Sequence, residues 1–230
     1  MRHWGRVLLV VGALAVGAAG QDVHVTGRVQ VLQKKGTPAS SAADVVVWLT
    51  PLDRAAPTAE QKEYKLTQHN KRFEPHLLIV PLGASVQFPN KDPFFHNVFS
   101  VYEGTAFDLG LYESGSSKVV HFNRPGPSYI FCNIHPEMSA VVLVLKTPYF
   151  ARTPANGEFS IDVPAGEYEM GVWYEKARRD DLKTLSRRVK IDAGEASLGK
   201  ITLTMAPSPA EGHKNKYGQD YEKGAPYPVP

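Results

Sequence analysis

The chain of 230 residues holds a single cysteine, Cys132, and it is followed at intervals of three by two other residues that bind soft metals, His135 and Met138. A lone cysteine can be a free thiol, half of an intermolecular disulfide or a metal ligand. A thiolate, an imidazole and a thioether on one short loop suit a soft or borderline metal. Copper uses methionine readily at a weak axial position, whereas zinc would take another Cys, His or carboxylate.

A second imidazole for such a site is available in the upstream segment FPNKDPFFHNVFSV. His96 stands before an apolar stretch, Asn97–Tyr102, that reads as a strand after a turn containing Pro and Asp. Two histidines, one cysteine and a distant axial methionine are the composition of a blue-copper centre. The expected ligands are His96, Cys132, His135 and Met138. We interpret five other histidines as surface residues or as residues whose hydrogen bonds are satisfied within the fold: His24, His69, His76, His121 and His213.

A cysteine nucleophile with His135 as its base is the main rival chemistry. That reading leaves His96 and Met138 unexplained, and no third residue is in evidence to orient the histidine. A multicopper oxidase or a nitrite reductase would need further histidine clusters, and the sequence contains no His-x-His. We therefore expect one copper ion and no enzyme activity.

The elements that must position these residues read as β-strands. Short apolar or alternating segments recur along the chain, separated by Gly, Pro, Asn or Asp, which favours an all-β sandwich. Two charged stretches, Ala56–Lys62 and Lys176–Leu185, are either helical turns or solvated loops. The expected strands are Val23–Val29, Val45–Leu49, Leu77–Val80, Val86–Phe88, Val98–Tyr102, Val119–Phe122, Tyr129–Phe131 and Val141–Leu145.

The pattern Cys-x-x-His-x-x-Met in CNIHPEM, with a proline after the histidine, resembles the cupredoxin family and is most similar to the short ligand loop of amicyanin. The upstream FEPHLLIVPLGASVQFPNKDPFFHNV is similar to the first half of that fold, and the resemblance spans residues 64–146. It implies a Greek-key sandwich with a type 1 copper site, in which Asn97 braces the ligand loop. It implies equatorial nitrogens from His96 and His135, the thiolate of Cys132 and an axial sulfur from Met138.

The flanks on either side of this region are similar to the carboxypeptidase regulatory-like domain, a small immunoglobulin-like sandwich. The similarity rests on VTGRVQVLQ and ADVVVWLTP before it, and on NGEFSIDVPAGEYEMGVWYE and RRVKIDAGEASLGKITLTM after it. We expect a cupredoxin domain over residues 58–147, inserted into a domain formed by 21–57 and 148–205. Alternatively, the first flank adds strands to the cupredoxin and the second is an independent domain. Trp48, Tyr168 and Trp173 are expected in the flanking core, in a scaffold or docking module.

Residues 1–20 read as an export signal, with Arg2 and Arg6 before an apolar run and with Ala18 and Gly20 before the cleavage point. A membrane anchor is the alternative, but the run is shorter than the roughly 20 residues that a spanning helix needs. We expect a secreted or periplasmic protein without a membrane span after the signal is removed.

Residues 206–230 are rich in Pro, Gly and charge, which indicates a disordered tail. The alternative is a segment that wraps its own body or a partner through Tyr217, Tyr221 and Tyr227.

The chain has 26 Lys and Arg against 23 Asp and Glu, without a basic stripe, which argues against nucleic acid as a partner. A copper site of the expected composition favours one-electron transfer to an unidentified redox protein that docks near His135. The alternatives are copper capture or delivery, and a structural role with incidental copper. The likeness to amicyanin does not bring a methylamine-oxidising partner with it. An apolar rim around His135 is expected from Phe94, Phe95, Ile134 and Pro136.

Overall fold

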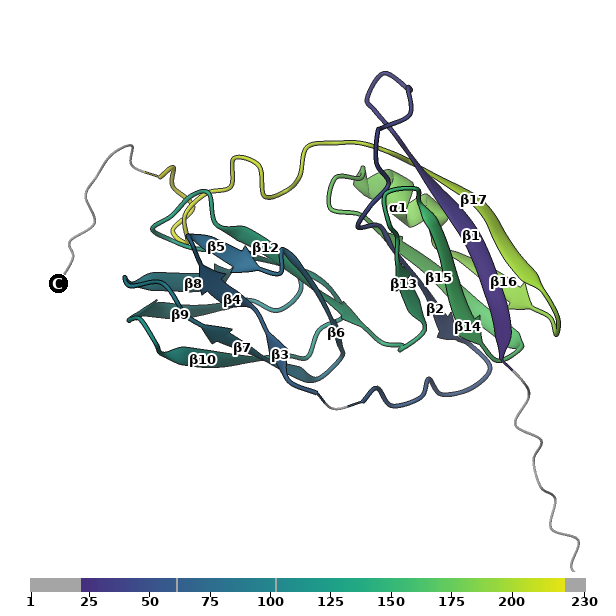
Figure 1. Cartoon of the computed structure of the whole chain (residues 1–230), viewed down its shortest axis with the longest axis horizontal. Coiled ribbons are helices and arrows are strands. Elements are labelled where there is room, and N and C mark those ends of the chain that lie inside the picture. Colours follow the sequence, from purple (N-terminus) through teal and green to yellow (C-terminus); the bar gives the residue numbers. More distant parts are fainter. Residues whose placement is uncertain (1–21, 61, 102, 222–230) are drawn as a thin grey trace, which may run out of the picture.

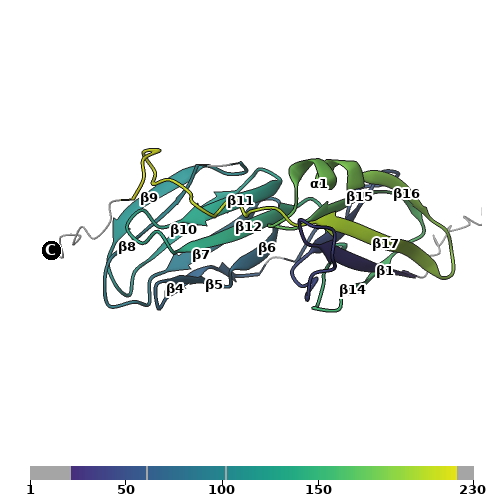
Figure 2. The same ribbon diagram turned by 90° about the horizontal axis from the view of Figure 1, so that it is seen from above.

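A computed structural model describes residues 22–60, 62–101 and 103–221, which form an all-β protein with one short helix (Figure 1). Two β-sandwiches lie end to end along the long axis of the molecule, as Figure 2 also shows. The expected export signal lies outside the described residues. Within the described ranges, no helix has the length and apolar character needed to cross a membrane.

The sandwich that carries Cys132 is built from ten strands between residues 64 and 145. They are β3 (Tyr64–Lys65), β4 (Thr67–His69), β5 (Arg72–Glu74), β6 (Leu77–Pro81), β7 (Ala84–Pro89), β8 (His96–Ser100), β9 (Phe107–Tyr112), β10 (Ser117–Phe122), β11 (Gly126–Phe131) and β12 (Ser139–Leu145). One sheet has the order β6-β12-β11-β8-β9, a second has the order β10-β7-β3, and β4 and β5 form a small hairpin.

The burial pattern of each strand depends on whether one or both faces of its sheet are covered. In β7 and β10, buried and more exposed side chains alternate, as expected of strands with one face toward a core. By contrast, β8 and β12 are buried almost throughout, which is typical of strands covered on both faces. One face of the larger sheet packs into the core with Phe88 and Phe122, and Cys132 and Met138 belong to the same cluster.

The second sandwich combines strands from both ends of the chain. Its elements are β1 (Val23–Leu32), β2 (Val46–Pro51), β13 (Phe150–Arg152), β14 (Glu158–Val163), β15 (Gly166–Trp173), α1 (Arg179–Leu185), β16 (Arg187–Ile191) and β17 (Ala196–Thr204). The sheets have the orders β14-β1-β17 and β13-β2-β15-β16. Because β1 pairs with β14 and β17, and β2 with β13 and β15, segments that precede and follow the first sandwich share one core.

All the predicted strands overlap strands of the structure, with ends that differ by a few residues. Of the two charged stretches, Lys176–Leu185 contains the helix α1, whereas residues 56–60 have no regular structure. Strand β9 was not predicted, because its sequence FDLGLY contains Asp and Gly, which are depleted in strands, and it lies at the edge of its sheet.

The two sandwiches meet through an apolar cluster on the outer face of the larger sheet. Trp173 and Val46 of the second sandwich pack there with Tyr129, Phe131 and Leu143. The indole of Trp173 also hydrogen-bonds the Tyr129 hydroxyl. The expectation that the tryptophans lie in the flanking core was therefore wrong: Trp173 and the partly buried Trp48 fill this junction.

Tyr168 does lie in the core of the second sandwich, as expected.

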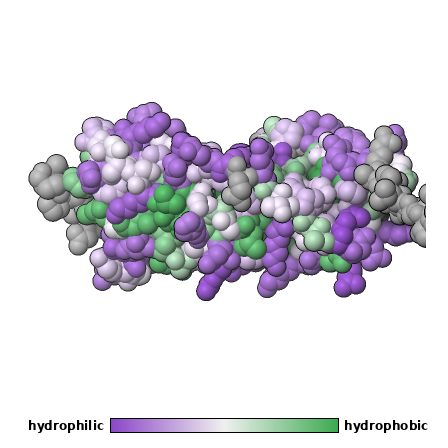
Figure 3. All heavy atoms as spheres, turned by 90° about the horizontal axis from the view of Figure 1, so that it is seen from below, coloured by the Kyte–Doolittle hydropathy of each residue, from purple (hydrophilic) through white to green (hydrophobic). Residues whose placement is uncertain are grey.

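On the face shown in Figure 3, hydrophobic residues gather mainly over the first sandwich, among hydrophilic ones. Exposed apolar side chains at single positions are normal for a protein surface.

Residues 206–221 run from β17 back over the first sandwich (Figure 1). The expected disorder does not hold for this part of the tail. The Ser208 hydroxyl donates to Glu175, the His213 ring stacks on Phe131 with centroids 4.0 Å apart, and the Tyr221 hydroxyl donates to the Cys132 carbonyl. Composition gave the wrong prediction because these few specific contacts offset the entropy lost on ordering. Tyr227 lies outside the described residues.

Candidate metal centre

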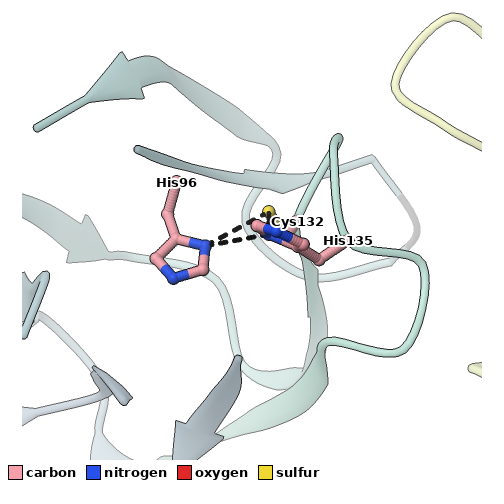
Figure 4. A group of neighbouring side chains, drawn as sticks. All are labelled: His96, Cys132 and His135. Carbon is pink, nitrogen blue, oxygen red and sulfur yellow. Dashed lines mark hydrogen bonds between the residues drawn. The ribbon is translucent and has the colours of Figure 1, made fainter. Parts of the chain in front are cut away.

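The three nitrogen and sulfur donors come from two elements at one end of the first sandwich. His96 is the first residue of β8, and Cys132 and His135 lie on the loop between β11 and β12 (Figure 4). Backbone hydrogen bonds close this loop: the Cys132 N–H donates to the Met138 carbonyl and the Met138 N–H donates to the His135 carbonyl, at 3.3 and 3.0 Å. The tight turn places the thiol and the His135 ring on the side that faces His96.

The donor atoms form a compact triangle with two similar sides and one shorter side. The Nδ1 atoms of His96 and His135 are 3.1 Å apart, and they lie 3.8 and 3.7 Å from the Cys132 sulfur. The point equidistant from the three donor atoms lies roughly 2.1 Å from each of them. Bonds from a metal ion to histidine nitrogen or cysteine sulfur have similar lengths, about 2.0–2.3 Å. The three residues therefore fit a single metal ion.

Asp92 sets the orientation and the tautomer of His96. The His96 ring is fully buried and its Nε2 atom lies 2.8 Å from the Asp92 carboxylate. Because a carboxylate only accepts, Nε2 carries the proton and Nδ1 presents a lone pair toward the sulfur. Burial lowers the pKa of His96, and Asp92 opposes this shift only in part. The imidazole is thus neutral and oriented as a ligand.

The backbone holds Asp92 itself in place. Its two carboxylate oxygens accept hydrogen bonds from the N–H groups of Asn70 and Lys71, at 2.6 and 2.9 Å. In the sequence, this Asp belongs to the turn before His96, and no role was expected for it. The signal that could have identified it is a carboxylate four residues before an expected ligand.

Cys132 is completely buried, and burial raises the pKa of its thiol. Backbone N–H groups of Asn97, Ile134 and His135 hydrogen-bond the sulfur and partly offset that effect. A catalytic cysteine needs a lowered pKa and access to substrate, and this thiol has neither. The geometry therefore disfavours the alternative of a nucleophile activated by His135.

His135 reaches furthest toward the surface of the three residues. Its ring is half-buried, and burial, followed by the neighbouring His96, lowers its pKa. The Phe94 ring packs edge-on or tilted against both imidazoles, with centroids 5.2 Å from His96 and 5.7 Å from His135. Of the residues expected around it, Pro136 is exposed and the others, Phe94, Phe95 and Ile134, are partly exposed.

Met138 and Asn97 both contact the ligand loop. Met138 is fully buried in the cluster that contains Cys132, and its backbone closes the ligand loop. Asn97 follows His96 on β8, and its side-chain oxygen accepts a hydrogen bond of 3.2 Å from the Asn133 N–H. This bond ties the strand that carries one ligand to the loop that carries the others.

Comparison with known proteins gives matches for part of the chain only. No family model matches the sequence, and no curated protein does. A copper-containing nitrite reductase from Thermus scotoductus SA-01 matches with a TM-score of 0.35 and 24% identity, over 42% of this chain and 25% of that chain. This chain therefore spans about a quarter of that enzyme.

Two smaller proteins match over nearly their full length. A purple cupredoxin from Nitrosopumilus maritimus matches with a TM-score of 0.33 and 21% identity, over 36% of this chain and all of that chain. An amicyanin mutant in its Cu(I) form matches with a TM-score of 0.35 and 20% identity, over 43% of this chain and 98% of that chain. These neighbours are proteins of the cupredoxin type.

Proposed function

We propose that His96, Cys132 and His135 bind one copper ion, with Met138 as a weak axial donor, and that the protein carries single electrons. The observation that carries this proposal is the triangle formed by the two imidazole Nδ1 atoms and one buried sulfur, with sides of 3.1 to 3.8 Å. Two imidazoles and a thiolate in one plane, with a thioether available nearby, are the donor set of copper electron-transfer sites.

The residues present favour copper over zinc. A structural zinc site uses four strong donors, and within the described residues the group of His, Cys, Asp and Glu side chains able to hold a metal ion has three members. The nearby carboxylate, Asp92, is occupied by Nε2 of His96 and by two backbone N–H groups. A thioether is then the donor left for a fourth position, and copper accepts it.

Bound copper would supply a one-electron Cu(I)/Cu(II) couple. The chain supplies a site whose geometry is set before the metal binds. Asp92 fixes the His96 ring, Asn97 ties β8 to the ligand loop, and three backbone N–H groups point at the sulfur. Because these contacts do not depend on the charge of the metal, little needs to move when an electron arrives or leaves. This favours a carrier over an enzyme.

We further propose that a redox partner docks on the face around His135. Of the three strong ligands, His135 alone is partly exposed, and Nε2 has no hydrogen-bond partner among the described residues. Exposed Pro93 and Pro136 flank the partly exposed Phe94 and Ile134 there. A small apolar contact suits the brief encounters of electron carriers.

The remaining parts of the chain suggest where and how the carrier works. Residues 1–20 have the sequence features of an export signal, so we propose a secreted or periplasmic location. We propose that the second sandwich is a carboxypeptidase regulatory-like module that serves as scaffold or docking surface. Its pairing of strands from both flanks supports this proposal.

The visible spectrum of the copper-loaded protein, combined with a redox titration, tests the proposed function. We expect intense thiolate-to-copper colour that disappears and returns reversibly with one electron per protein. Cys132→Ser should lose the colour while keeping the β-sheet circular dichroism. A colourless protein that prefers one equivalent of zinc would contradict the metal assignment. Coloured protein that gives up its copper readily to an apo acceptor would favour copper delivery instead.

A further inference from the structure

The C-terminal segment, defined here as residues 206–221, closes a ring of hydrogen bonds around the ligand loop. The Asn133 N–H donates to Asn97, and the Asn97 amide donates to Asp108 at 2.8 Å. The Lys216 ammonium donates to the other Asp108 oxygen at 2.7 Å. The Lys216 N–H returns to the Asn133 side-chain oxygen at 2.9 Å. Asn133, which follows Cys132 directly, is thus held from both sides.

Tyr221 adds a contact to the cysteine residue itself. Its hydroxyl lies 3.0 Å from the Cys132 carbonyl and 3.0 Å from Nε2 of His213. His213 is anchored in turn, because Nδ1 bonds the Ala210 carbonyl and the ring stacks on Phe131, the residue before Cys132. The C-terminal segment therefore contacts three consecutive residues, Phe131, Cys132 and Asn133.

The far end of the same segment is attached to the second sandwich. The Met205 N–H donates to the Leu32 carbonyl, the Ala206 N–H donates to the Lys176 carbonyl, and Ser208 donates to Glu175. Ala210 then packs in the junction between the sandwiches. The segment is thus attached to the second sandwich at one end and contacts the ligand loop near its other end, which distinguishes it from a chain end that merely rests on a surface.

We propose that the C-terminal segment is a structural part of the metal centre, in which Lys216 and Tyr221 are positioning residues for the Cys132–His135 loop. The proposal rests on the proposed function in that this loop holds copper. Loops open locally more easily than sheets do, and a loop with ligands on it loses metal affinity when it opens. Bonds from Lys216 and Tyr221 stabilise the closed loop, both with and without metal.

Reactivity of the cysteine in the metal-free protein tests the proposal. Cys132 is the only cysteine and is fully buried, so a thiol reagent reaches it only after the loop opens. In the double variant Lys216→Met and Tyr221→Phe, the ammonium and the hydroxyl that bond Asp108 and Cys132 are gone. Each lost hydrogen bond should raise the labelling rate about two- to tenfold.

A matched control comes from the same segment. Lys214 pairs with Asp220 within the segment, and Tyr217 is 71% exposed. The double variant Lys214→Met and Tyr217→Phe removes the same chemical groups but keeps both loop contacts and the aromatic ring that lies against the Lys216 ammonium, so it should label at the wild-type rate. Equal rates in both double variants would overturn the proposal. The thermal unfolding of every variant is measured in parallel. If the Lys216→Met and Tyr221→Phe variant does not fold, the single variant Tyr221→Phe takes its place in the labelling test.

Copper readouts separate this proposal from the proposed function. With copper bound, the Lys216→Met and Tyr221→Phe variant should keep its colour but lose copper to a chelator faster than the control variant, by about two- to tenfold for each lost hydrogen bond. If no variant or wild-type protein binds copper, the proposed function fails, while the labelling rates still decide whether the segment holds the loop. If all the proteins are coloured and the two double variants do not differ in labelling or in copper release, the positioning role is wrong. The proposed function then still stands.

Discussion

The Nδ1 atoms of His96 and His135 lie 3.1 Å apart in the interior of one end of a β-sandwich. One of the rings has its tautomer set by Asp92, so a lone pair points at its neighbour. Cys132 faces both rings, and burial keeps the imidazoles neutral and the thiol protonated in the absence of metal. Binding of a metal ion would replace the thiol proton and give the converging donors a common partner.

Replacing Asp92 tests the support of His96. Asp92→Ala removes the acceptor that fixes the tautomer, so copper affinity should fall about 10- to 100-fold, as is usual when such a partner of a ligating histidine is lost. Competition with a chelator of known affinity measures this. The thermal midpoint of the metal-free variant is the control, because Asp92 also caps two backbone N–H groups. Unchanged affinity would show that the surrounding packing alone orients His96.

Replacing Met138 tests the axial position. Met138→Leu keeps the volume in the core but removes the thioether, so copper should still bind. The reduction potential should rise, because loss of an axial donor disfavours Cu(II). Voltammetry and the visible spectrum measure the change. If neither differs from wild type, Met138 serves in packing only, and Glu137 becomes the next fourth donor to test.

The stability of the metal-free protein should depend on pH through the two ligand histidines. Burial lowers the pKa of both His96 and His135 below the ordinary value of about 6.5. The unfolded chain therefore takes up protons first, and stability should fall as pH drops from 6.5 toward the lowered values. Denaturant unfolding at a series of pH values measures the slope. The slope should be shallower in His135→Gln; an identical slope would assign it to other groups.

The pair of His76 and Glu175 should act in the opposite sense at the junction. Its nitrogen and oxygen are 2.7 Å apart, and the hydrogen bond with Glu175 raises the pKa of His76. Its contribution to stability is present below about pH 6.5 and is lost as pH rises through the raised pKa. His76 is half exposed, so solvent limits the contribution to about 1 kcal/mol or less.

NMR titration of His76 in the wild type and in Glu175→Gln measures this coupling. The pKa should return toward its ordinary value in the variant. Ser208→Ala, which leaves the His76 partner in place, is the control. A His76 pKa that is the same in wild type and Glu175→Gln would contradict the role of the pair.

A charge on the His135 face should slow electron exchange without disturbing the metal. Pro136 is exposed next to His135, and Pro136→Glu would place a charge in the proposed contact. A loss of roughly 1.4 kcal/mol in the encounter would slow the bimolecular rate about tenfold. Val119→Glu, at another exposed apolar position, is the control. Equal rates in the two variants, with unchanged spectra, would place the docking face elsewhere.

The sequence by itself determined the donor types on the ligand loop. Cys132, His135 and Met138 are three residues apart, so any tight connection between two strands presents them together. The alternating apolar segments likewise indicated an all-β sandwich, because strand periodicity is local. His96 could be proposed as the second histidine from its position at the start of a strand.

Tertiary structure alone decided what surrounds these donors. Lys216 and Asn133 are 83 residues apart in the chain, and Tyr221 and Cys132 are 89 apart, so no local pattern links them. The composition of the C-terminal segment indicated disorder. Composition carries no information about the distant residues of the first sandwich against which the segment packs. Trp173 likewise lies in the junction and not in the expected core, because the residues it packs against belong to the other sandwich. Long-range packing assigns such partners, and it depends on the path of the whole chain.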